Sequence, residues 1–110
     1  MKKDHLLYVN HILEAISAIE LFMSSTSKDS FYNDKMCYSA VLYNLQIMAE
    51  STKRIPEKIK QKHPTIPWKD IVGFRNILVH EYLEGLDNNI IWHIISSELP
   101  LLKSAMLQEK

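Results

Sequence analysis

Apolar side chains recur every three or four residues along almost the whole chain, and this spacing limits what the chain can fold into. Because a helix turns about 100° per residue, side chains at this spacing form one stripe along an α-helix. The pairs Ile90–Ile91 and Ile94–Ile95 also repeat at the helical period rather than at every second residue. With two glycines and four prolines in 110 residues, little interrupts the helices. The sequence therefore predicts an all-α fold without β-strands, an up-and-down bundle of about four to five helices.

Four helical segments follow from this spacing and from the residues that begin and end helices. They are expected at residues 4–23, 33–62, 68–79 and 88–106, joined by connections at 24–29, 63–67 and 83–87. Asn33 or Asp34 suits the N-cap of the second helix, and Asp87 suits that of the fourth. We expect Pro56 to kink the second helix and Pro100 to bend or split the fourth, because proline removes a backbone donor and clashes with the preceding turn.

Length and composition indicate a cytoplasmic protein. The 110 residues suffice for one domain with its own core, so we expect residues 1–110 to form a single domain. One cysteine, Cys37, excludes an internal disulfide and the usual zinc ligand sets. The apolar runs fall far short of the roughly 20 residues of a membrane span, and the N-terminus has no signal-peptide core. We therefore expect the protein to stay away from membranes.

Charge is balanced overall but unevenly placed. Thirteen basic residues match thirteen acidic ones, which does not favour binding of nucleic acid through bulk charge. One segment is nevertheless basic and holds Lys53, Arg54, Lys58, Lys60 and Lys62, with only Glu57 opposing them. A solvated helix face is the slightly favoured interpretation of this segment. The alternative is a local patch that steers phosphate groups.

The stretch from Phe74 to Tyr82 holds the residues best suited to chemistry. Histidine titrates near neutral pH and can remove a proton, whereas arginine stays charged and forks onto phosphate oxygens. Tyrosine can stack on a base or donate a hydrogen bond. Arg75, His80 and Tyr82 would thus suit RNA cleavage in which a ribose 2′-hydroxyl attacks its own phosphate. By spacing alone, a purely structural interpretation is better: Arg75 caps a helix, His80 is partly buried near a helix end, and Tyr82 lies in the core.

Helical geometry constrains how these residues could cooperate. Arg75 and His80 are five residues apart and would point about 140° away from each other in a regular helix. For both to act on one phosphate, the helix must end near His80 or a second subunit must supply a group. Asn76 shares a helix face with His80 and could orient either a phosphate or that histidine. Glu50 and Arg54 are spaced to pair on one helix surface.

The segment Arg75-Asn76-Ile77-Leu78-Val79-His80-Glu81-Tyr82 resembles the R-x4-H-x-Y motif of the HepT-like toxins, which belong to the HEPN superfamily. The likeness is not confined to this octapeptide. Residues 66–74 resemble the segment before the motif, residues 87–100 resemble the last helix of the family, and residues 7–19 resemble its opening helix. The match spans essentially the whole chain.

This resemblance implies a dimeric, HEPN-like helical bundle in which two copies of the motif line one cleft. It implies a metal-independent endoribonuclease that uses no cofactor, with Arg75 and His80 as catalytic residues and Tyr82 beside them. It also implies the toxin of a type II HepT/MNT toxin–antitoxin system, silenced when a cognate minimal nucleotidyltransferase antitoxin adenylylates the Tyr82 hydroxyl. Two alternatives stay open: a catalytically silent module that binds nucleotide or RNA in the same cleft, and a helical dimerisation protein.

Overall fold

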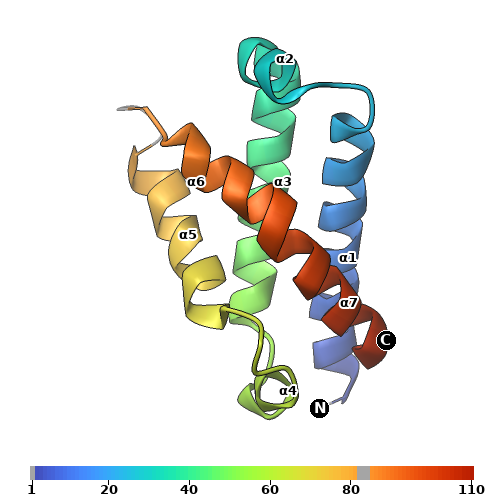
Figure 1. Ribbon diagram of the computed structural model, residues 1–110. Helices are drawn as coiled ribbons and strands as arrows, with labels where there is room; N and C mark the ends of the chain where they lie inside the picture. The colour runs from blue at the N-terminus through green and yellow to red at the C-terminus, as the bar shows by residue number, and fades with distance from the viewer. Residues whose placement is uncertain (1, 82–84) are drawn as a thin grey trace.

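The computed structural model describes residues 2–81 and 85–110, and every regular element in these two ranges is a helix (Figure 1). The elements are α1 (Lys2–Met23), α2 (Lys28–Asn33), α3 (Lys35–Lys53), α4 (Glu57–Lys62), α5 (Trp68–Glu81), α6 (Asn88–His93), the π-helical segment η1 (Ile94–Glu98) and α7 (Leu99–Glu109). Helices α1, α3 and α5 run side by side in alternating directions, and the run from α6 to α7 crosses them obliquely (Figure 1). The predicted all-α, up-and-down bundle is confirmed.

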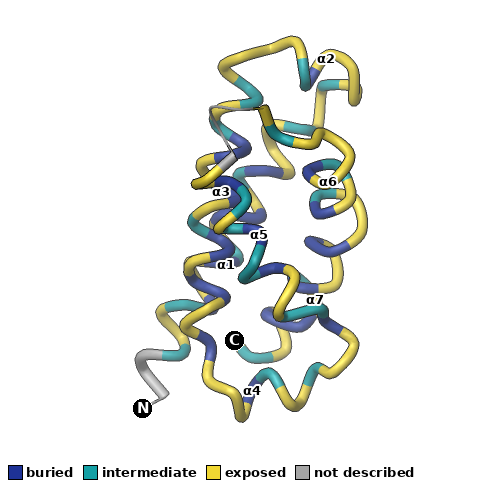
Figure 2. The backbone as a smooth tube through the Cα atoms, turned by 90° about the vertical axis from the view of Figure 1, so that its left-hand side faces the viewer, coloured by how far each residue is buried: buried dark blue, intermediate teal, exposed yellow. Residues whose placement is uncertain are grey.

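Helix α3 is the centre of the bundle, because it packs against α1 on one side and α5 on the other. Leu45 and Met48 of α3 are fully buried, as is Met106 of α7, which packs against α1. Buried residues line the facing sides of the long helices, whereas exposed residues dominate α2 and α4 at the two ends of the bundle (Figure 2). The core therefore lies between the long helices, and α2 and α4 cap it.

Helix α1 is apolar enough and long enough to cross a membrane when judged by length and composition alone. The segment His5–Met23 has a mean hydropathy of 1.4. The expectation that no segment has this property was therefore wrong. Ile12, Ile16 and Ile19 of this helix are nevertheless at most 1% exposed, because they face α3 and α7. One face of α1 thus packs into the core, while 28% of its apolar window as a whole is buried.

A short helix, α2, lies where the sequence predicted only a connection. The Ser27 hydroxyl accepts a hydrogen bond from the Ser30 backbone N–H at 3.1 Å, and Phe31 is fully buried below it. A serine N-cap is a strong helix-start feature, but the surrounding run of polar residues obscured it. The Tyr32 hydroxyl donates to the Asn88 carbonyl oxygen at 2.7 Å and so ties α2 to the start of α6.

The helix predicted over residues 33–62 is broken rather than kinked, so the expectation of one continuous helix was wrong. Asp34 caps α3 as predicted, because its carboxylate accepts from the Cys37 backbone N–H at 3.1 Å. Pro56 has no N–H and disfavours helical backbone at the residue before it, so the chain leaves the helix at Lys53. It resumes as α4, where Ile59 is again buried.

The last predicted helix is split near Pro100, but the interruption is a π-helical turn. Asp87 caps α6 as predicted, since its carboxylate accepts from the Asn89 backbone N–H at 2.9 Å. The wider turn η1 follows, and Pro100 then lies in the first turn of α7. Proline suits that position because its missing N–H would have no helical partner there.

Candidate functional site

Arg75 lies in the middle of α5 and reaches across to α3. Its Nε donates to Oε1 of Glu50 over 2.7 Å, and the two side chains are 41% and 46% exposed. The predicted pairing of Glu50 with Arg54 is therefore replaced by a pairing between helices. Because the contact engages Nε, the terminal nitrogens of the guanidinium stay available to an anion.

A groove of about 480 Å³ runs between α3 and α5 and contains Arg75. Among the described residues, its charged lining consists of Arg75, Lys53 and Arg54 against the carboxylate of Glu50. Three cations and one anion leave an excess of positive charge, which favours a phosphate or another anion. The described residues that line it are Ala49, Glu50, Lys53, Arg54, Val72, Arg75 and Asn76.

The basic segment predicted from sequence is divided between different surroundings. Lys53 and Arg54 are exposed and line the groove, a position that agrees with both the solvated-face and the phosphate-steering interpretations. Lys60 lies over the Trp68 ring, 5.9 Å from its centroid, and Lys62 lies 3.7 Å from Glu109. Sequence reasoning did not assign Lys53 and Arg54 to the site. Their spacing of three and four residues from Glu50 places them on its side of α3 and could have done so.

Within one chain, the side chains of His80 and Arg75 do not lie together. Helix α5 continues to Glu81, so Arg75 and His80 point about 140° apart and are separated by about 7.5 Å along the axis. His80 is exposed on the last turn and does not line the groove. Asn76 precedes it by one turn and does line the groove, beside Arg75. The structure thus brings Arg75 and Asn76 together and leaves His80 outside the groove.

Tyr82, the remaining predicted site residue, lies outside the described residues. The described chain resumes at Gly85, whose φ of 100° is a conformation that glycine adopts without strain. Of the predicted connection at 83–87, residues 85–87 are described; they lie outside a helix, and Asp87 caps α6.

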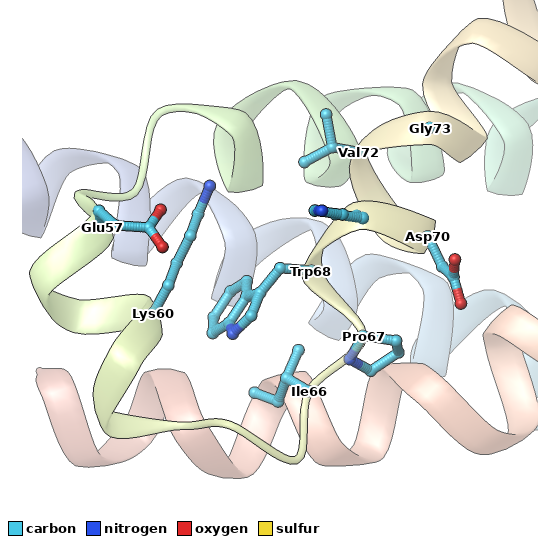
Figure 3. Close-up of a pocket in the computed structure, with 9 residues that line it drawn as sticks. Glu57, Lys60, Ile66, Pro67, Trp68, Asp70, Val72 and Gly73 are labelled. Atoms are coloured by element: carbon cyan, nitrogen blue, oxygen red, sulfur yellow. The ribbon is translucent and has the colours of Figure 1, made fainter.

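A second and larger cavity, of about 640 Å³, adjoins the groove at the start of α5 (Figure 3). Trp68 and Ile66 supply much of its apolar lining, and Lys60 and Glu57 lie at its α4 side (Figure 3). Val72 lines both this cavity and the groove, so the two hollows share a wall.

Glu98 is a buried carboxyl group of η1, and it faces a side of α5 that does not carry Arg75. It is 5% exposed, and its Oε2 has no hydrogen-bond partner among the described residues. Burial raises the pKa of Glu98; the charge of His93 opposes this shift, and that of Asp70 adds to it. It lines a cavity of about 340 Å³ between α5 and α6. Within the described ranges, no three His, Cys, Asp or Glu side chains gather closely enough to hold a metal ion.

Comparison with known proteins gives consistent matches. A family model described as "Ribonuclease HepT-like" matches residues 12–108. A "Probable ribonuclease HepT" of Thermococcus cleftensis is 37% identical over 103 residues, which cover 94% of this chain and 93% of that protein. A "Putative RNase" of Caldanaerobacter subterraneus subsp. tengcongensis is 34% identical over 96 residues, which cover 87% of this chain and 85% of that protein.

A longer relative matches as well. A "Gamma-glutamylcyclotransferase and putative RNase" of Methanocaldococcus jannaschii is 34% identical over 108 residues, which cover 98% of this chain but 48% of that protein. This chain therefore spans about half the length of that relative. No solved structure matches the chain.

Proposed function

The chain belongs to the HepT-like ribonuclease family, and from this premise we propose that it is a metal-independent endoribonuclease, the toxin of a type II HepT/MNT toxin–antitoxin system in the cytoplasm. The observation that carries the proposal is the groove between α3 and α5. It offers a half-exposed Arg75 guanidinium flanked by Lys53 and Arg54, which is a suitable environment for an RNA phosphate.

In the proposed reaction, the ribose 2′-hydroxyl attacks the adjacent phosphorus while His80 removes its proton. The bond from phosphorus to the 5′-oxygen breaks, and that oxygen gains a proton. The products are a 2′,3′-cyclic phosphate and a 5′-hydroxyl end. Arg75 binds the non-bridging oxygens, whose negative charge increases in the transition state. Asn76 orients the phosphate from the same wall of the groove.

We propose a homodimer, because one chain leaves His80 outside the groove that holds Arg75. Exposed apolar side chains support this: Tyr43 of α3 is 65% exposed and Val79 of α5 is 45% exposed. Tyr43 is seven residues before Glu50 and Val79 is four residues after Arg75, so each shares a helix side with a residue of the groove. Burying this face against a second copy would place two α5 motifs along one cleft. Sedimentation of the protein at micromolar concentration tests the assembly, and a 12.9 kDa species alone would contradict it.

The proposed control is adenylylation of Tyr82 by a cognate nucleotidyltransferase antitoxin. This proposal rests on the family resemblance. The phenol oxygen of Tyr82 attacks the α-phosphorus of ATP, AMP is transferred and pyrophosphate leaves. The added phosphate brings about one negative charge to the motif, two residues from His80 in the sequence, and like charges repel. Mass spectrometry after incubation with antitoxin and ATP should locate the adduct on Tyr82. Full silencing of an active Tyr82→Phe variant would show that the modification is unnecessary.

Cleavage itself is tested with purified protein and RNA in the presence of a chelator. Wild-type protein should cut and leave cyclic phosphate ends, whereas Arg75→Ala and His80→Ala should lose about 10²–10⁴-fold in rate while keeping their helical circular dichroism. Lys103→Ala is the matched control, because Lys103 forms an ion pair with Glu20 elsewhere on the surface. Undiminished cleavage by His80→Ala would refute its role, and loss of cleavage in chelator would refute metal independence. RNA binding without cleavage would favour the silent binding module.

A further inference from the structure

Trp68, Val72 and Arg75 form one stripe along α5. They are spaced by four and three residues, so their side chains leave the helix on nearly the same side. Trp68 and Arg75 are two helical turns apart, which is about 10.5 Å along the axis. Val72 lies between them and lines both hollows, so the Trp68 cavity extends the Arg75 groove along the helix.

The Trp68 ring is held in a fixed orientation. Its Nε1 donates to the His63 carbonyl oxygen at 3.0 Å, which satisfies the one polar group of the indole. The ring is half-buried, and Lys60 runs beside it with Glu57 turned toward that lysine (Figure 3). The polar edge of the ring is occupied by backbone, and the Lys60 ammonium lies over the ring, 5.9 Å from its centroid. A base that stacks on that face of the rigid ring therefore takes the place of the Lys60 side chain.

The charges around this cavity balance, unlike those of the groove. Lys60 and Lys69 stand against Glu57 and Asp70, so two cations face two carboxylates. The cavity therefore has no charge excess to attract a phosphate. Its volume of about 640 Å³ falls in the range of small-molecule sites. An uncharged flat group that is joined to a phosphate fits both hollows together.

We propose that the Trp68 cavity is a subsite for one base of a single-stranded RNA whose neighbouring phosphate binds Arg75. The inference rests on the proposed function and adds to it a part of the substrate-binding surface. The base stacks on the indole, and every base has a π-face, so the subsite tolerates different sequences. Phosphate recognition and base recognition are thus divided between the middle and the start of one helix.

Fluorescence tests the subsite directly, because the chain has two tryptophans. Trp92→Phe leaves Trp68 as the sole reporter. This variant is titrated with a 2′-O-methyl oligoribonucleotide, which cannot be cut because it lacks the attacking hydroxyl. Stacking should quench Trp68 with the same midpoint as binding measured by polarisation. An oligonucleotide of equal length without bases should cause no quenching and bind more weakly. Binding without quenching would overturn the proposal.

Matched substitutions supply the second measurement. Trp68→Leu removes the aromatic surface but keeps apolar volume, and should raise the Kd for the oligonucleotide at least about fivefold. Trp92→Leu removes the other indole and should leave Kd within twofold of wild type. If Trp68→Leu fails to fold by circular dichroism, the quenching result decides. Cleavage of RNA without quenching of Trp68 would reject the base subsite but support the ribonuclease function. Quenching of Trp68 without cleavage would support the subsite but reject the ribonuclease function. No binding of RNA would reject both.

Discussion

Replacing Glu50 with glutamine should tighten RNA binding. Glu50 accepts a hydrogen bond from Arg75 at 2.7 Å and is the one carboxylate among the described residues that line the groove. An RNA phosphate that enters the groove must approach this negative charge and share the guanidinium with it. Glu50→Gln removes the charge and keeps the size of the side chain.

The size of the effect follows from the exposure of the pair. Arg75 and Glu50 are 41% and 46% exposed, so solvent screens their attraction, and such pairs contribute about 0.2–1 kcal/mol. A phosphate about 6 Å from the carboxylate would be repelled by about 0.7 kcal/mol in water. Both figures point to a gain of at most about 1 kcal/mol, which corresponds to roughly a fivefold lower Kd.

The assay is polarisation of a labelled 2′-O-methyl oligonucleotide, at low salt and again at high salt. Glu20→Gln is the matched control, because it removes the same charge and breaks a similarly exposed ion pair, that with Lys103. Glu50→Gln should lower Kd about two- to fivefold, and the control should change it less than twofold. The difference should shrink at high salt, since salt screens exposed charges.

Two results would refute this reasoning. An equal gain for both variants would mean that only net charge matters and that the groove holds no phosphate. Weaker binding by Glu50→Gln would mean that the carboxylate orients Arg75 for RNA rather than competing for it. A parallel measurement of cleavage at saturating RNA separates orientation from competition, because lost orientation lowers kcat.

Three further predictions concern stability. Burial raises the pKa of Glu98 above 4.5, so the free energy of unfolding of the wild type should fall as pH rises through the raised value. Urea unfolding between pH 4 and 8 should show a smaller fall for Glu98→Gln. The hydrogen bond from His63 lowers the pKa of Glu109, so the stability that this carboxylate contributes above pH 4.5 should vanish as pH falls through the lowered value. Thermal unfolding should show that the Tm of Glu109→Gln falls less in acid than that of the wild type. Phe31→Ala should cost about 3–5 kcal/mol in urea unfolding, because the ring is fully buried under α2.

Most of the fold could be predicted because local rules and packing agree. Asp34 and Asp87 cap helices in the structure as their sequence positions indicate. The prediction was wrong where two rules compete. Around Pro56 the apolar spacing continues, and Ile59 is buried as that spacing requires, but the backbone cannot stay helical. At Ser27 the polar composition indicated a loop, whereas burial of Phe31 stabilises a helix.

The site was less predictable because its contacts join distant segments. Glu50 has a candidate partner four residues later, Arg54. It pairs instead with Arg75, 25 residues away, because α3 packs against α5. Lys53 and Arg54 reach the groove for the same reason. The angular separation of Arg75 and His80 was predictable, because it depends on helix geometry alone. The outcome at Tyr82 stays a prediction.

Because of the π-helical turn at Ile94–Glu98, the chain should tolerate the deletion of one residue there but not the insertion of one. In an unbroken α-helix, Leu102 would stand about 80° away from the direction of Ile94, yet both side chains are buried. The wider turn absorbs one residue and returns α7 to phase with α6. Deleting Ser97 should therefore convert the run into ordinary α-helix while Leu102 and Met106 still face the core. An alanine inserted at the same place should turn α7 by about 100° and expose them.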